Sequence, residues 1–138
     1  MKKNQKKNSS ELYAVIGLGR FGMALARELA AKGKSLLVID YDREKINEVL
    51  EFTDNAFVIN SLTIDALEET GIGEADVAVV CIGEKIDISI LATLNLMKLG
   101  VKRVISKAMS EEQGEVLKLL GAEVVYPEHD MALRLASK

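Results

Sequence analysis

Residues 13–22 read Tyr13-Ala14-Val15-Ile16-Gly17-Leu18-Gly19-Arg20-Phe21-Gly22, so that a short apolar run leads into a Gly-x-Gly-x-x-Gly turn. A second apolar run, residues 35–40, follows and ends in Asp40. This order of strand, glycine turn, helix, strand and terminal acid is the fingerprint of a dinucleotide-binding fold. We therefore predict that the chain binds an adenine nucleotide at this turn.

Each glycine of the turn has its own expected role. Gly17 permits the tight turn, Gly19 lets the backbone approach a pyrophosphate, and Gly22 lets the helix and the strand pack closely. The amides at the helix start, together with the positive end of the helix dipole, would hold the phosphates. Asp40 would accept hydrogen bonds from ribose hydroxyls, and its charge would repel a 2′-phosphate.

Alternatives to ligand binding stay open at this turn. The glycines could form a turn without a ligand, and Asp40 could cap a helix over residues 43–50, although Asp42 is better placed for that cap. The context favours a ligand. Leu12–Ile16 is short, apolar and β-branched, as a buried parallel strand should be, and Gly33 stands where the following helix would stop.

The length and composition limit the classes of function. The chain has 138 residues, of which 49% are hydrophobic, and one cysteine. This suffices for one domain with a core but not for a second catalytic domain. No run approaches the roughly twenty apolar residues of a membrane span, and no secretory signal is visible. Cys81 lies in an apolar run, which predicts a reduced core residue of a cytoplasmic protein, with a reactive thiol as the alternative.

The first ten residues differ in charge from the remainder. They carry Lys2, Lys3, Lys6 and Lys7 and no acid, so the net charge of −3 for the whole chain leaves residues 11–138 near −7. We expect residues 1–10 to be a disordered, Lys-rich tail. The acidic body argues against a nucleic-acid partner.

Short apolar strands alternate with amphipathic helices beyond Asp40. Further strands are expected at residues 56–60, 75–82, 102–106 and 123–126. Helices are expected at residues 43–52, 64–70, 84–99, 111–120 and 128–137. With the strands at 12–16 and 35–40, the prediction is a single-domain α/β Rossmann fold over residues 11–138, a doubly wound parallel sheet of six strands in the order 3-2-1-4-5-6.

The fold predicts which other residues meet the ligand, because ligands of such sheets lie beyond the carboxyl ends of the strands, at the switch point between strands 1 and 4. Beside Gly17, Gly19, Gly22 and Asp40, these ends supply Arg20, Phe21, Tyr41, Asn60, Ser61, Leu62, Cys81, Ile82, Gly83 and Lys107. Asn60 and Ser61 suit an adenine edge or a ribose, or else a turn that begins a helix. Lys107 could place its ammonium near a phosphate, or it could be solvated.

Arg20 is unusual in such a loop. A guanidinium here can donate a pair of hydrogen bonds to phosphate oxygens. The phosphate can belong to a ligand of the same subunit or of a neighbouring subunit. The alternative is an exposed arginine without a role, which is disfavoured because a cation at a helix N-terminus is otherwise unfavourable.

Three segments in this order carry a resemblance to a known family: Ala14–Gly22, Val38–Asp40 and Tyr126–Met131. The chain resembles the N-terminal lobe of the RCK or KTN domain (TrkA-N), the cytosolic regulator of Trk/Ktr-type potassium transporters and of some potassium channels. The similarity runs from about residue 11 to the end of the chain.

The resemblance implies a regulator and not an enzyme. Lobes of this family dimerise and assemble into an octameric ring, whose shape changes when ATP, ADP, NAD or NADH exchange. By similarity, Asp40 would hold the ribose, Arg20 would reach the terminal phosphate, and Lys107 would lie on the phosphate side. Glu128 would help to hold Mg²⁺, Ca²⁺ or Na⁺ beside the phosphates. The helix from Asp130 would pack against a partner.

Two departures from the family pattern stand out. The family often has glycine, a small residue and asparagine after the fourth strand, whereas Gly83 is followed here by Glu84 and Lys85. An acid near phosphates would be repulsive unless it points away. The second, smaller lobe of the family is also missing from these residues, so we expect the first lobe alone. The implied location is the cytoplasm, at the inner face of the cell membrane through a potassium transporter or channel.

Two other classes of function remain as alternatives. An NAD-dependent oxidoreductase, or its cofactor-binding fragment, would need an acid/base group near the nicotinamide. The only histidine, His129, follows the last expected strand. A redox-sensing DNA-binding regulator would have to use residues 1–10, which are too short for a DNA-binding module. One cysteine and one histidine also exclude a Cys/His metal site.

Overall fold

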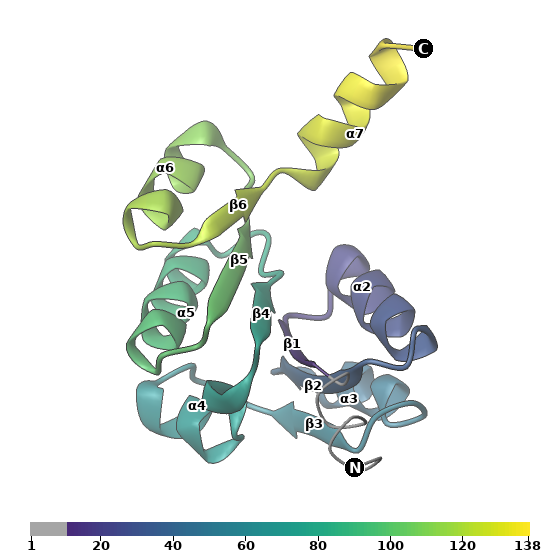
Figure 1. Cartoon of the computed structure of the whole chain (residues 1–138), viewed down its shortest axis with the longest axis vertical. Coiled ribbons are helices and arrows are strands. Elements are labelled where there is room, and N and C mark those ends of the chain that lie inside the picture. The colour runs from purple at the N-terminus through teal and green to yellow at the C-terminus, as the bar shows by residue number, and fades with distance from the viewer. Residues whose placement is uncertain (1–10) are drawn as a thin grey trace, which may run out of the picture.

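A single sheet of six parallel strands forms the centre of the computed structural model, which describes residues 11–138 (Figure 1). The strands are β1 (Leu12–Ile16), β2 (Ser35–Asp40), β3 (Asn55–Val58), β4 (Val77–Val80), β5 (Arg103–Lys107) and β6 (Glu123–Val125). Their order is β3-β2-β1-β4-β5-β6, which confirms the predicted doubly wound Rossmann topology. The tail predicted for residues 1–10 lies outside the described residues.

A helix follows each strand, because neighbouring parallel strands must be joined by a crossover connection. The helices are α2 (Arg20–Ala31), α3 (Arg43–Val49), α4 (Ile64–Glu69), the short 3₁₀ helix η1 (Ile72–Glu74), α5 (Ile86–Lys98), α6 (Glu111–Leu119) and α7 (Pro127–Ala136). Helices α2 and α3 cover one face of the sheet, while α4, α5 and α6 lie on the other (Figure 1).

Each face of the sheet therefore has its own core. Val15 packs with Ala26 of α2 and Ile46 of α3. Ala14 points the other way and packs with Leu67 of α4 and with α5. Successive side chains of a strand point to opposite faces, so a strand that is buried on both faces must be apolar at every position. This requirement explains why the apolar residues 12–16 and 36–39 predicted β1 and the body of β2.

The region after β4 differs from the prediction. The apolar run 75–82 was expected to be one strand, but β4 comprises only Val77–Val80. Helix α5 begins at Ile86, two residues later than expected. Residues 81–85 therefore form a loop at the carboxyl end of β4, and Lys107, expected just after the fifth strand, is instead the last residue of β5.

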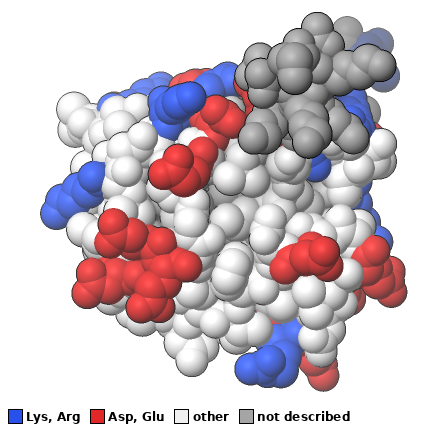
Figure 2. Space-filling model, turned by 60° about the horizontal axis from the view of Figure 1, so that its bottom comes forward, with Lys and Arg blue, Asp and Glu red and all other residues white. Residues whose placement is uncertain are grey.

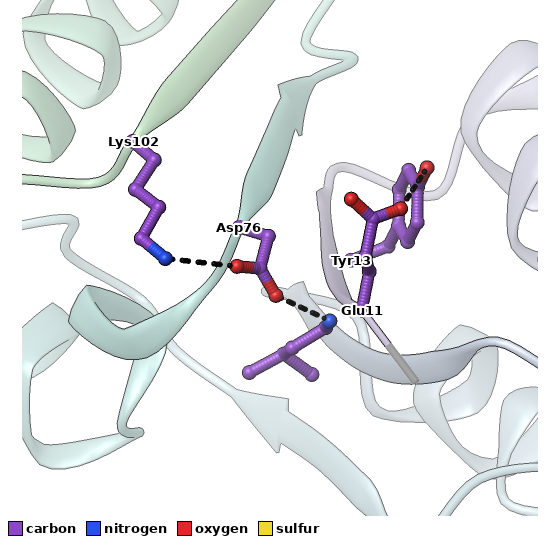
Figure 3. Close-up of polar contacts among 5 residues, drawn as sticks. Glu11, Tyr13, Asp76 and Lys102 are labelled. Atoms are coloured by element: carbon purple, nitrogen blue, oxygen red, sulfur yellow. Dashed lines mark hydrogen bonds and ion pairs between the residues drawn. The ribbon is translucent and has the colours of Figure 1, made fainter. Parts of the chain in front are cut away.

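The amino ends of the central strands are tied together by side chains. Asp76, just before β4, accepts a hydrogen bond from the Leu12 N–H at 2.9 Å and one from the Lys102 ammonium at 3.3 Å (Figure 3). The Leu12 N–H and Lys102 together hold the pKa of Asp76 below its ordinary value. This carboxylate thus links the starts of β1, β4 and β5, at the edge opposite to the predicted ligand site.

The acidic character of the body is visible on its surface. Figure 2, in which the lower end of Figure 1 faces the viewer, shows acidic side chains gathered in several groups around an uncharged area, with basic side chains mainly at the margin. Such a face does not offer the continuous positive surface that a phosphate backbone needs. Within the described residues, no helix is long and apolar enough to cross a membrane.

Candidate functional site

A cleft of about 740 Å³ lies beyond the carboxyl ends of β1, β2, β4 and β5. Its walls are the glycine turn after β1, the residues after β2 and β3, the loop after β4, and Lys107 at the end of β5. This is the switch point of the doubly wound sheet, where ligands of such folds bind. The volume falls within the range of small-molecule sites, about 300–1,000 Å³.

The structure brings most of the predicted site residues to this cleft. Those that line it are Gly17, Gly19, Arg20, Phe21, Asp40, Tyr41, Asn60, Leu62, Cys81, Ile82, Gly83, Lys107 and Glu128. Two predicted residues are not part of the lining. Gly22 lies behind the glycine turn, against Gly17, and Ser61 is exposed outside the cleft.

Sequence reasoning missed several lining residues: Ile16, Leu18, Ile39, Lys45, Ile59, Ile88 and Met109, together with Glu84 and Lys85, which were noted only as departures. Lys45 lies in the first turns of α3, which begins directly after the Asp40 end of β2, so its place was foreseeable from the helix start. Met109 follows β5 by two residues and could have been found in the same way as Lys107.

The three glycines of the turn meet different surroundings. Gly17 has a φ of +99°, and a side chain there would lie 3.1 Å from the backbone of Cys81. A Cβ on Gly22 would overlap the carbonyl oxygen of Gly17. At Gly19, by contrast, φ is −68° and a Cβ would meet nothing within 4 Å. The packing of the protein therefore requires Gly17 and Gly22 but gives no reason for Gly19.

Asp40 orders the turn that it faces. It is only 8% exposed, and its Oδ2 accepts a hydrogen bond from the Leu18 N–H at 2.6 Å. Its Oδ1 accepts one from the Asp42 N–H at 2.8 Å. Asp42, and not Asp40, caps α3 by accepting a hydrogen bond from the Glu44 N–H. An ionised carboxylate has about four acceptor positions, so both Asp40 oxygens keep capacity for ribose hydroxyls.

Lys107 is a buried cation at the base of the cleft. The residue is 9% exposed, and its ammonium lies 3.6 Å from the Glu128 carboxylate and 5.8 Å from the centre of the Phe21 ring. A side chain on Gly83 would lie 3.6 Å from the same ammonium. The alternative interpretation of Lys107 as a solvated lysine is therefore wrong. Its ion pair with the exposed Glu128 is long, at 3.6 Å, so the ammonium can also bind an anion.

Cys81 lines the cleft as a thiol rather than a thiolate. Burial raises its pKa to about 12, although the nearby Lys107 acts in the opposite direction. Because the thiolate is the reactive form, this environment disfavours the reactive-thiol alternative.

The charges of the cleft contrast with those of the acidic body. Arg20, Lys45, Lys85 and Lys107 line it, against three carboxylates. Arg20 is exposed and forms no ion pair within residues 11–138. Four cations around one concave site focus a local positive potential that suits a polyphosphate.

The cleft offers little for acid/base or metal chemistry by itself. His129 is exposed in the first turn of α7 and is not among the lining residues. No group of three or more His, Cys, Asp or Glu side chains in the described part of the chain could hold a metal ion. A cation at Glu128 would therefore need further oxygens from a ligand.

Residues 13–127 match the TrkA-N domain family. The Ktr system potassium uptake protein A of Vibrio alginolyticus is 37% identical over 133 residues, which are 96% of this chain and 60% of that protein. The Ktr system potassium uptake protein C of Bacillus subtilis is 39% identical over 125 residues, 90% of this chain and 57% of that protein. The chain thus spans less than two thirds of the length of these relatives.

Solved structures share the fold. The TrkA-N domain of the inner membrane protein ybaL from Escherichia coli superposes with a TM-score of 0.83 at 19% identity, covering 93% of this chain and 96% of that one. The GsuK channel bound to NAD gives a TM-score of 0.72 at 16% identity, covering 84% of this chain and 21% of that one. GsuK bound to ADP gives 0.67 at 16% identity, with 84% and 31% covered.

Proposed function

This chain belongs to the TrkA-N domain family, and on that premise we propose that it is a cytosolic regulatory domain that binds an adenine nucleotide and controls potassium transport by a membrane partner. The ligand is ATP, ADP, NAD or NADH, and its exchange changes the conformation of the assembled regulator. The domain performs no reaction of its own on the nucleotide.

The free space around Gly19 is the observation that supports the nucleotide-binding part of the proposal. The backbone conformation of this glycine is open to any residue, and a side chain there would point into empty space at the cleft. Gly19 is the N-cap of α2, where glycine is preferred over alanine, and the free space around it also lets another molecule approach its backbone closely. The first amides of α2 beside it form a phosphate site.

The charges of the cleft favour a particular kind of nucleotide. Arg20 and Lys107 offer two cations to the phosphates, one exposed and one buried. Asp40 lies at the other end of the glycine turn, where its charge supports a ribose with free hydroxyls and opposes a 2′-phosphate. The related GsuK fold has been solved with NAD and with ADP. We propose that a weakly held Mg²⁺, Ca²⁺ or Na⁺ joins Glu128 to the phosphates.

The regulatory part rests on the relatives, which are potassium uptake proteins of the Ktr system. Ligands that differ at the phosphate end can drive a switch only if they bind two conformations unequally. We propose that α7 packs on a second copy of the chain, because Met131, Leu133 and Leu135 of this helix are all exposed. The dimers then assemble into a ring at the inner face of the membrane beneath the transporter.

Titration calorimetry tests the nucleotide-binding part directly. The wild-type chain, Gly19→Ala and Gly73→Ala are titrated with ATP, ADP, NADH and NADPH. Gly73 is the matched control because a Cβ there meets only an ordinary contact, the Leu99 carbonyl oxygen at 3.7 Å, and lies outside the cleft. We expect Gly19→Ala to weaken nucleotide binding at least tenfold, about 1.4 kcal/mol, and Gly73→Ala to leave it unchanged.

Potassium transport provides the second test. Cells that carry a Ktr-type membrane subunit and a full-length regulator containing this domain are compared with cells that carry the Gly19→Ala regulator. We expect potassium uptake to lose its response to nucleotide in the variant. A variant that has lost nucleotide binding but regulates uptake normally would contradict the regulatory proposal.

A further inference from the structure

Two side chains that follow the strands on either side of β1 meet at the cleft. Tyr41 directly follows β2, and Lys85 lies in the loop between β4 and α5. The Lys85 ammonium is 5.4 Å from the centre of the Tyr41 ring, within the reach of a cation–π contact, about 6 Å. Both residues line the cleft.

The strand order determines what this contact spans. β2 and β4 are each hydrogen-bonded to β1, which lies between them. Neighbouring strands are about 4.8 Å apart, so the ends of β2 and β4 are about 10 Å from one another. The contact between Tyr41 and Lys85 therefore spans the carboxyl end of β1, where the glycine turn begins.

The packing of the protein does not account for this pair. Tyr41 is 65% exposed, although tyrosine is a large and partly apolar side chain. Lys85 is exposed and forms no ion pair in the part of the chain that the structure describes. The two side chains thus share one described interaction, and both line the cleft.

We propose that Tyr41 and Lys85 form a closure over the nucleoside end of the cleft, which opens to admit and to release a nucleotide. This inference rests on the proposed nucleotide binding and deepens it. The contact between the two side chains must break before an adenosine can pass beneath it. Tyr41 and Lys85 are positioning residues that set the rates of association and release.

Transient kinetics on matched variants tests the closure. An ATP analogue with a fluorophore on its terminal phosphate, far from the adenosine, reports association and dissociation by stopped-flow mixing. Calorimetry with unlabelled ATP, ADP and NADH gives Kd for the same proteins. Tyr41→Leu removes the ring and keeps the charge of Lys85, whereas Tyr41→Phe keeps the ring and is the control.

We expect Tyr41→Leu to raise both kon and koff by about two- to fivefold, the factor that corresponds to an exposed cation–π contact. Kd then changes less than either rate, and Tyr41→Phe, which keeps the ring that meets Lys85, returns both rates toward those of the wild type. In a Lys85→Met background, Tyr41→Leu should have no further effect, because the contact is already lost.

Two results would overturn the closure while nucleotide binding stands: an unchanged kon in Tyr41→Leu, or an equal effect of Tyr41→Leu with and without Lys85. The first would mean that access does not require the pair to open, and the second that Tyr41 acts independently of Lys85. If the wild-type chain binds none of the three unlabelled nucleotides, the proposed function fails together with the closure.

Discussion

Replacement of Gly22 by alanine should separate the structural glycines of the turn from the one that serves a ligand. The added Cβ would overlap the carbonyl oxygen of Gly17 and lie 3.2 Å from the Cβ of Cys81. Because the first obstacle is backbone and not a flexible side chain, α2 and the glycine turn must move apart.

The magnitude follows from two opposing effects. Overpacking of this kind costs about 1–3 kcal/mol, while alanine in a helix gains up to about 1 kcal/mol over glycine. The net expectation is a loss of about 1–2 kcal/mol in the free energy of unfolding, accompanied by weaker nucleotide binding because the turn is displaced. Gly19→Ala should weaken binding with a smaller loss of unfolding free energy, about 0.5 kcal/mol, because alanine is a poorer N-cap than glycine but meets no obstacle.

Urea unfolding followed by circular dichroism measures the first quantity, and calorimetry with ADP measures the second. Gly73→Ala serves again as the control for a glycine replacement outside the cleft. The reasoning would be refuted if Gly22→Ala were as stable as the wild type, or if Gly19→Ala lost as much stability as Gly22→Ala.

Three further predictions concern single side chains. Asp40→Asn should raise the affinity for NADPH relative to NADH in calorimetry, because the charge that opposes a 2′-phosphate is removed; an unchanged ratio would exclude Asp40 from the ribose site. The pKa of Asp76 is lowered from 3.8 in the folded protein, so its stabilising contribution is present above that pH and is lost as the pH falls through the folded pKa. Asp76→Asn should therefore flatten the acid side of the stability profile, measured by urea unfolding between pH 2 and 6 (roughly the window set by an Asp pKa). Cys81, with its pKa raised to about 12, should react with iodoacetamide much more slowly in the native chain than in urea, and equal rates would contradict its burial.

The sequence predicted the strand order because buried parallel strands leave a strong signal. In the runs at residues 12–16 and 35–40, the positions that face either core are apolar. Glycines or capping residues mark the ends of the helices between the strands. The error after β4 has a physical cause. Cys81 belongs to one core and Ile82 packs against the other, and both also line the cleft, so their apolar character alone does not show that they pair in the sheet.

The side-chain arrangement of the cleft was less accessible to prediction. The strand ends could be placed together from topology, which found Asp40 and Lys107. The hydrogen bond from the Leu18 N–H to Asp40 depends on the path of the backbone through the turn. The meeting of Tyr41 and Lys85 depends on the length and direction of two loops. Neither has a periodic pattern in the sequence.

The exposed position of α7 determines how fast its amide hydrogens exchange with solvent. The helix has ten residues, none of them buried, and it extends away from the sheet (Figure 1). Isolated helices shorter than about 12–15 residues are marginal in water. Its amide hydrogens should therefore exchange with deuterium long before those of β1 and β4, without unfolding of either core. If a second copy covers this helix, the same amides become protected in proportion to protein concentration, so the order of the last helix is a property of the assembly and not of the single chain.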